Sequence, residues 1–127
     1  MRYLSAQEIL VLHALVVDET GGSHGVRDTG LLQSIAAKPA ARFGGKELYK
    51  GIFPKAAVLL EAIANYHVFF DGNKRTSLIV AARFLALNGY TFAASNTNAE
   101  TMILGVATKE AGVEEIVTWL KKNSKRA

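Results

Sequence analysis

The sequence predicts an all-α domain of six helices, because helical signals recur along the chain and no segment indicates a sheet. Apolar residues return at helical spacing, capping residues precede most of these segments, and glycine or proline follows them. The 127 residues fit one domain, residues 1–127, and 50% of them are hydrophobic, which is enough for a core. We therefore expect a compact six-helix bundle with a central apolar helix and a short flap.

The first two helices are separated by a glycine-rich loop. The first helix follows the capping box Ser5–Glu8, in which a hydroxyl and a carboxylate satisfy free backbone N–H groups. It ends at the glycines that open the loop Gly21–Arg27. Asp28 or Thr29 can cap the second helix, which should stop before Pro39.

The middle of the chain contains the flap and two further helices. The flap, Ala40–Ile52, has three glycines and should be irregular or hairpin-like. The third helix is expected from Pro54, a residue suited to a first turn, to about His67. The fourth should run from near Asn73 to Asn88, and its few polar positions predict that it is the central, largely buried helix.

Two helices are expected in the last third of the chain. The capping box Thr97–Glu100 should open the fifth helix. Gly112 separates it from a sixth that carries Ile116 and Leu120 at helical spacing. Trp119, on the same helix, is most simply a core residue.

Composition narrows the possible functions. Lysine and arginine outnumber aspartate and glutamate by 15 to 11, and the charge of +4 favours an anionic partner such as a nucleotide, nucleic acid or an acidic protein surface. The absence of cysteine excludes disulfides, thiolate metal sites and a cysteine nucleophile. No apolar run reaches the roughly 18 residues of a membrane span, and the N-terminus lacks a secretory signal. We expect a cytoplasmic protein with no membrane partner.

The segment His67–Thr76, with the sequence HVFFDGNKRT, carries the strongest signal for chemistry. It joins the third and fourth predicted helices, so the free N–H groups and partial positive charge of a helix start lie beside it. Gly72 lets the backbone approach a ligand closely, and Lys74 and Arg75 add positive charges that suit phosphate oxygens. We interpret the segment as a nucleotide-phosphate site.

The same residues also have a purely structural interpretation. Asp71 could be the N-cap of the fourth helix, with Lys74 and Arg75 a solvated patch. Against this, cations in a first turn oppose the helix dipole at a cost of roughly 0.3–1 kcal/mol each, which a bound phosphate would reverse. His67 could then act as a general base, and Asp71 could hold Mg²⁺ together with phosphate oxygens.

The remaining candidates have simpler interpretations. His13 and His24 lack a second ligand at helical spacing, so we interpret both as structural or exposed. Phe69 and Phe70 should anchor the loop in the core. Arg27 is expected to be a solvated cap of the second helix, with a phosphate or partner contact as the alternative.

The segment His67–Thr76 also resembles the signature of a known protein family. The pattern His67-x-Phe69-x-Asp71-Gly72-Asn73-Lys74-Arg75-Thr76 resembles the signature loop of the Fic/Doc family. The resemblance covers nearly the whole chain, including the glycine-containing stretch after the first helix and Phe84-Leu85-x-x-Asn88-Gly89 after the motif. It is closest to the Doc branch, the "death on curing" toxins of bacterial and phage toxin–antitoxin modules, which have a compact all-helical fold.

The resemblance implies a role for each residue of the loop. His67 would be the catalytic base that activates a target hydroxyl, and Asp71 would hold Mg²⁺. The phosphates of ATP would be held by Gly72, Asn73, Lys74 and Arg75. The flap would dock an extended segment of the target protein by backbone pairing. The flap residues concerned are Gly44, Gly45, Lys46, Leu48 and Tyr49.

Lys74 indicates which group is transferred. Typical Fic enzymes, which resemble this chain in the same loop, transfer AMP and have glycine at this position. The Doc branch has lysine and is similar to a kinase that phosphorylates a threonine of elongation factor Tu and so blocks translation. Lys74 therefore favours transfer of the γ-phosphate, with AMP transfer as the alternative. The internal inhibitory motif of many Fic proteins is not apparent, so a separately encoded antitoxin is the expected regulator.

Two other classes of function remain open. A small, helical and basic chain could bind nucleic acid, but the helix after the motif offers only Lys74, Arg75 and Arg83 and is otherwise apolar. No direct nucleic-acid contact is therefore expected. A non-catalytic interaction domain could also keep the fold, although the complete loop, from His67 to Arg75, favours an enzyme.

Overall fold

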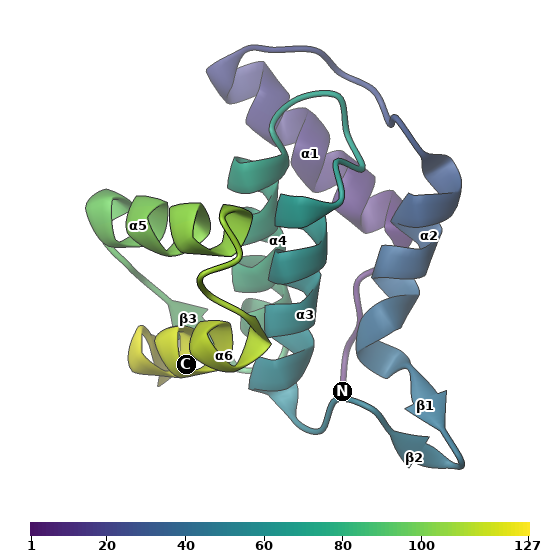
Figure 1. The fold of residues 1–127 in the computed structure, drawn as a ribbon, viewed down its shortest axis with the longest axis vertical. Coiled ribbons are helices and arrows are strands. Elements are labelled where there is room, and N and C mark those ends of the chain that lie inside the picture. Colours follow the sequence, from purple (N-terminus) through teal and green to yellow (C-terminus); the bar gives the residue numbers. More distant parts are fainter.

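Helix α3 (Ile52–Asn65) runs through the centre of the structure, and every other helix except the first packs directly against it; the first packs against the second and fourth (Figure 1). The computed structural model describes the whole chain, residues 1–127. The surrounding helices are α1 (Ala6–Thr20), α2 (Thr29–Ala37), the short 3-10 helix η1 (Lys38–Ala40), α4 (Asn73–Leu87), α5 (Asn96–Ala107) and α6 (Val113–Lys122). The six α-helices confirm the predicted class. None of them is both long enough and apolar enough to cross a membrane.

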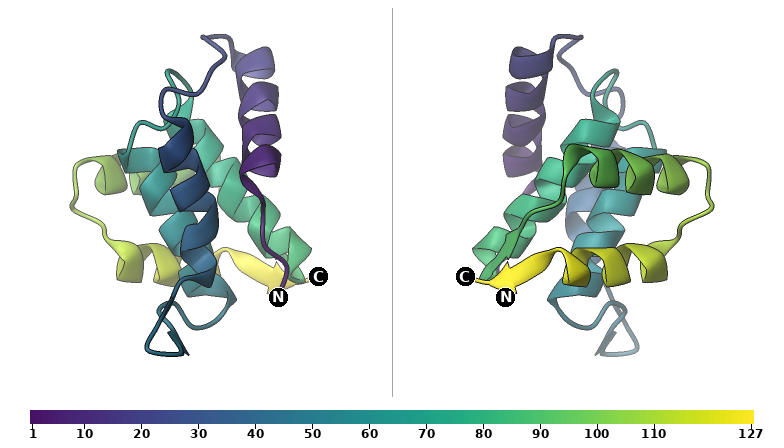
Figure 2. Two further views of the ribbon diagram at one scale, coloured as in Figure 1. Left: turned by 90° about the vertical axis from the view of Figure 1, so that its right-hand side faces the viewer. Right: turned by 90° about the vertical axis from the view of Figure 1, so that its left-hand side faces the viewer.

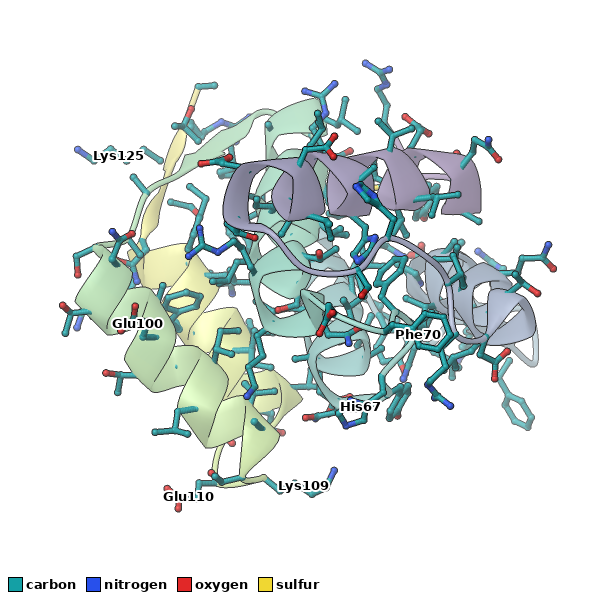
Figure 3. All side chains as sticks on the ribbon, turned by 90° about the horizontal axis from the view of Figure 1, so that it is seen from above. His67, Phe70, Glu100, Lys109, Glu110 and Lys125 are labelled. Atoms are coloured by element: carbon teal, nitrogen blue, oxygen red, sulfur yellow. The ribbon has the colours of Figure 1, made fainter.

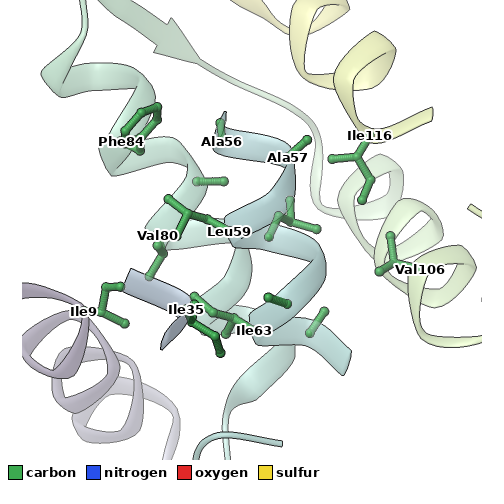
Figure 4. Close-up of a cluster of buried hydrophobic side chains, with 14 of the residues drawn as sticks. Ile9, Ile35, Ala56, Ala57, Leu59, Ile63, Val80, Phe84, Val106 and Ile116 are labelled. Carbon is green, nitrogen blue, oxygen red and sulfur yellow. The ribbon is translucent and has the colours of Figure 1, made fainter. Parts of the chain in front are cut away.

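The core forms where neighbouring helices cover α3. Most of the side chains of α3 are buried, because apolar residues occupy nearly every turn of this helix. Figure 4 shows the side chains that surround it. They come from every other α-helix and include Ile9 of α1, Ile35 of α2, Val80 and Phe84 of α4, Val106 of α5 and Ile116 of α6. Burial of each large apolar side chain contributes about 1.5–3 kcal/mol, so these shared contacts hold the helices together.

The helix expected to be central, α4, is less deeply buried than α3. Its inner face packs against α3, whereas Ile79 on its outer face is 37% exposed. The difference follows from charge: α3 carries only Lys55 and Glu61, while α4 opens with two exposed cations, Lys74 and Arg75. α3 and α4 therefore occupy the centre together, and α3 is the more buried of the two.

Two short antiparallel strand pairs accompany the helices. β1 (Arg42–Phe43) and β2 (Lys46–Glu47) form the hairpin of the flap, in agreement with the prediction for this segment. β3 (Tyr90–Phe92) pairs with β4 (Ser124–Arg126), which the sequence does not predict because three-residue strands are too short to show an alternating pattern. Both views of Figure 2 place this second pair beside the N-terminus.

The predicted capping box of α5 does not form. The Ser95 hydroxyl accepts a hydrogen bond from the N–H of Asn98 at 3.1 Å, so Ser95 is the N-cap and the helix begins at Asn96. The box expected at Thr97–Glu100 therefore lies inside the first turn. Trp119 of α6 is buried, as predicted, and its indole N–H donates to the Asn98 side chain.

Candidate active site at the start of α4

The loop Tyr66–Gly72 connects α3 to α4 and presents His67 to solvent (Figure 3). α3 ends at Asn65, before the expected His67, because His67 has a φ of 51° that no right-handed helix can continue. Left-handed backbone is uncommon for residues with a Cβ atom and is often found at functional sites. The helix thus stops where the candidate base projects from the surface.

The start of α4 has no side-chain cap. Gly72 is the N-cap, in a left-handed conformation with φ of 77° and ψ of 14°, and no side chain closes the first turn. The structural alternative in which Asp71 caps this helix is therefore wrong. Because glycine supplies no side chain here, the N–H groups of the first turn can donate hydrogen bonds to an anion.

Lys74 and Arg75 add positive charge to this helix start. Both are exposed, and no carboxylate forms an ion pair with either. They border a cavity of about 560 Å³ that lies between α4, α5 and the end of α1, and whose lining includes Glu19, Leu78 and Ile79. Small-molecule sites commonly have this size. The lining combines the two cations and an apolar wall with two carboxylates, Glu19 and Glu100.

Asp71 is exposed and bound at two points. Its Oδ2 accepts a hydrogen bond from the N–H of Ser23 at 3.0 Å, and its backbone carbonyl accepts one from Nε2 of His13 at 2.7 Å. His13 is 1% exposed and stacks on the ring of Phe69 at 3.8 Å, which confirms its structural role. These two hydrogen bonds fix the position of Asp71. Its other carboxylate oxygen, Oδ1, makes no hydrogen bond to the protein.

The donor set around Asp71 decides which metal it could hold. No group of three or more histidine, aspartate or glutamate side chains gathers anywhere in the structure. A resident metal ion held by protein ligands alone does not fit this site. A Mg²⁺ ion fits, because it is usually held by one or two carboxylates together with water and the phosphate oxygens of a substrate.

Asn73 closes the loop on itself. Its Oδ1 accepts a hydrogen bond from the N–H of Phe69 at 3.1 Å, and its Nδ2 donates to the carbonyl of Phe69 at 2.9 Å. The amide that was expected to hold phosphate is thus engaged with the loop backbone. Asn73 fixes the distance between the two ends of the turn that precedes α4.

The two phenylalanines of the loop have different surroundings. Phe69 is fully buried, as predicted, whereas Phe70 is 61% exposed, so the prediction that both anchor the loop is wrong for Phe70 (Figure 3). Sequence cannot distinguish them, since both are large and apolar. The Phe70 ring lies over Gly25 of the α1–α2 loop, where a Cβ atom would come within 3.4 Å of it.

The α1–α2 loop contributes a residue whose role the sequence did not reveal. Arg27 does not cap α2, so its interpretation as a solvated cap is wrong, while a contact with phosphate or a partner stays a prediction. Its guanidinium donates to the backbone carbonyls of Tyr66 and His67. An arginine in a glycine-rich loop was the only available signal, and it did not identify these partners.

The flap lies at the opposite end of α3 from His67 (Figure 1). α3 has 14 residues, so about 21 Å separate its ends. The structure therefore does not bring the predicted docking residues to the candidate base. These residues are Gly44, Gly45, Lys46, Leu48 and Tyr49. A target segment paired with the flap would need roughly six more extended residues to reach His67.

An ion pair between the buried Lys55 and the partly exposed Glu47 fixes the flap to the core. Lys55 is fully buried, and its Nζ donates to the carbonyl of Pro39 at 2.7 Å and to Oε1 of Glu47 at 3.0 Å. The hydrogen bond and the charge of Lys55 hold the pKa of the Glu47 carboxyl below its usual value. The flap is thus tied to both α3 and η1.

Comparisons with known proteins agree with this arrangement. A family model described as the Fic/DOC family matches residues 3–85, which include the whole loop and most of α4. The chain is 36% identical over 120 residues to Toxin Doc from Mycolicibacterium smegmatis, covering 93% of this chain and 90% of that protein. It is 34% identical over 122 residues to Protein kinase doc from Escherichia phage P1, covering 96% and 95%. This chain therefore belongs to the Fic/Doc family.

Proposed function

We propose that this protein is the toxin of a bacterial toxin–antitoxin pair and that it acts as a protein kinase with Mg-ATP as its phosphate donor. The observation that carries the proposal is the exposed His67 beside the uncapped, cationic start of α4. The names of the two relatives, a Doc toxin and a protein kinase, support the same function. The target would be a threonine or serine of a translation factor in the cytoplasm, with elongation factor Tu as the first candidate.

The residues of the loop have complementary roles in the proposed reaction. The oxygen of the target hydroxyl attacks the γ-phosphorus of ATP, and the His67 imidazole accepts its proton. The bond from the γ-phosphorus to the bridging oxygen breaks, and ADP leaves. Lys74, Arg75 and the first-turn N–H groups of α4 stabilise the negative charge on the transferred group.

Asp71 would hold the Mg²⁺ ion that accompanies ATP. The ion supplies positive charge that offsets the charge of the phosphates. Its expected ligand, the carboxylate of Asp71, keeps its position through the N–H of Ser23. This arrangement needs only one carboxylate from the protein, as the donor set of the loop allows.

Transfer of AMP is the alternative reaction of the same site. It uses the same base and the same helix start, and differs in which phosphorus faces the hydroxyl and in its leaving group, pyrophosphate. Lys74 in the first turn of α4 favours the kinase because this position is lysine in the Doc branch. An experiment must therefore identify the phosphorus that is transferred.

The test uses ATP labelled at either the α- or the γ-phosphate. The purified protein is incubated with elongation factor Tu, Mg²⁺ and each labelled ATP in parallel, and the modified residue is located by mass spectrometry. Label from the γ position alone supports the kinase, whereas label from the α position replaces it with AMP transfer.

Matched histidine variants show whether the site itself is responsible. His67→Ala should abolish transfer and relieve the growth arrest caused by expression without antitoxin. His24→Ala removes another exposed histidine, one that pairs with Asp18, and should do neither. Absence of transfer to any protein, together with equal toxicity of His67→Ala and wild type, would contradict the enzymatic proposal.

A further inference from the structure

Arg27 binds three consecutive carbonyl oxygens of the loop that carries His67. Its Nε donates to the carbonyl of His67 at 2.6 Å, and its Nη2 donates to that of Tyr66 at 3.2 Å. Its backbone N–H donates to the carbonyl of Val68 at 2.9 Å. One residue therefore fixes the peptide groups on both sides of the candidate base.

The backbone conformation that Arg27 holds is unfavourable by itself. Apart from glycines, only His67 and Lys109 have a positive φ in this structure. A residue with a Cβ atom stays in this region only where its surroundings determine it. The carbonyls of Tyr66 and His67 follow the last turn of α3, where the partial negative charge of the helix end attracts a guanidinium.

The surroundings of Arg27 show no competing role. Its side chain is exposed, and it forms no ion pair with aspartate or glutamate. The next residue, Asp28, caps α2 by accepting a hydrogen bond from the N–H of Leu31 at 2.9 Å. Arg27 therefore directly precedes the N-cap of α2, and this helix holds the backbone of Arg27 in place.

We propose that Arg27 is a positioning residue of the active site, which fixes the left-handed backbone at His67 and so aims the imidazole at the target hydroxyl. Backbone φ sets the direction of the Cα–Cβ bond relative to the preceding chain, so a return of His67 to negative φ would move the ring away. The catalytic part of this inference rests on the proposed function, because it takes His67 as the base. The conformational part does not.

The conformational part can be tested without substrate. The three-bond HN–Hα coupling and the backbone chemical shifts of His67 report its φ in solution. Arg27→Met keeps an unbranched side chain and the backbone N–H but removes the guanidinium donors to Tyr66 and His67, and it should shift His67 to negative φ. Arg83→Met, which replaces an exposed arginine of α4, should leave the His67 signals unchanged. Unchanged His67 signals in Arg27→Met would overturn the proposal.

The kinetic part distinguishes positioning from phosphate binding. Arg27→Met should lower kcat about tenfold or more while the affinity for Mg-ATP changes little, because only the aim of the base is lost. A weaker affinity with unchanged kcat would make Arg27 a phosphate ligand and overturn the proposal. If the wild type transfers neither group, the proposed function fails, and the His67 signals alone decide the role of Arg27.

Two further variants distinguish the proposed role of Arg27 from a general loss of structure. Arg27→Lys keeps the charge but lacks the forked donors that reach two carbonyls, so its kcat should lie between those of Arg27→Met and wild type. In Arg27→Ala, millimolar guanidinium should restore part of kcat and ammonium should not. Lack of rescue, with a normally folded variant, would count against positioning by the guanidinium.

Discussion

Asp71 is held at both its backbone and its side chain, which limits where a cation can lie. The Nε2 of His13 binds its carbonyl, and the N–H of Ser23 binds Oδ2. Oδ1 has no protein partner and is the atom available to Mg²⁺. A fixed carboxylate loses little conformational freedom when it binds a ligand, so the proposed Mg²⁺ contact would cost little ordering at Asp71.

Replacement of Asp71 by asparagine should therefore reduce activity more than stability. In Asp71→Asn the amide oxygen can still accept from Ser23, so the thermal midpoint should change little. Loss of the negative ligand should lower phosphate transfer roughly tenfold or more at saturating protein target, equal to about 1.4 kcal/mol of transition-state stabilisation. The measurement is the transfer rate as a function of Mg²⁺ concentration.

Asp18→Asn is the matched control for this prediction. Asp18 is an exposed aspartate near the end of α1 that pairs with His24. Its replacement should leave the Mg²⁺ dependence as in the wild type. An identical Mg²⁺ dependence in Asp71→Asn and wild type would remove Asp71 from the proposed metal site.

At the scale of secondary-structure elements, the start of α4 depends on one glycine. Gly72 has a φ of 77°, and a Cβ atom added there would lie 3.6–3.7 Å from side-chain atoms of Val16, Val17 and His13. These distances are ordinary van der Waals contacts, so backbone conformation and not crowding sets the cost of substitution. An L-residue in left-handed backbone costs roughly 1–2 kcal/mol.

Gly72→Ala should accordingly lower the free energy of unfolding by about 1 kcal/mol, measured by urea denaturation. Gly105→Ala is the control with the opposite sign. Gly105 lies within α5 at helical φ, where an alanine should stabilise by roughly 0.5–1 kcal/mol. A change of the same sign in both variants would contradict this account of the α4 start.

The elements that the sequence predicted are those whose signals are local. The Ser5 capping box and the Asp28 cap form as expected, because each involves partners three residues away. The motif likewise predicted which chemical groups the loop carries. The contact from Arg27 to His67 joins positions 40 apart, and the burial of Phe69 but not Phe70 depends on the packed loops. Such contacts exist only after the helices have packed.

At the scale of the whole molecule, α3 connects two separate regions. Its C-terminal end leads to His67, and its N-terminal end holds the flap through Lys55 and Glu47 (Figure 1). Because Lys55 is fully buried, its charge depends on Glu47 for compensation. The attachment of the flap should therefore be sensitive to the charge of one carboxyl.

Glu47→Gln should lower the thermal midpoint, and the size of this loss should depend on pH. The folded-state pKa of Glu47 lies below its ordinary value of 4.5, so the ionised carboxylate stabilises the folded protein above that pH. This stabilisation is lost as the pH falls through the lowered pKa. The midpoint difference between wild type and Glu47→Gln should thus be full at around pH 7 and shrink below about pH 4.5. Glu110→Gln is the control, because it replaces an exposed glutamate that makes no ion pair, and its thermal midpoint should show no such pH dependence. A pH-independent loss in Glu47→Gln would refute the role of the Glu47 charge.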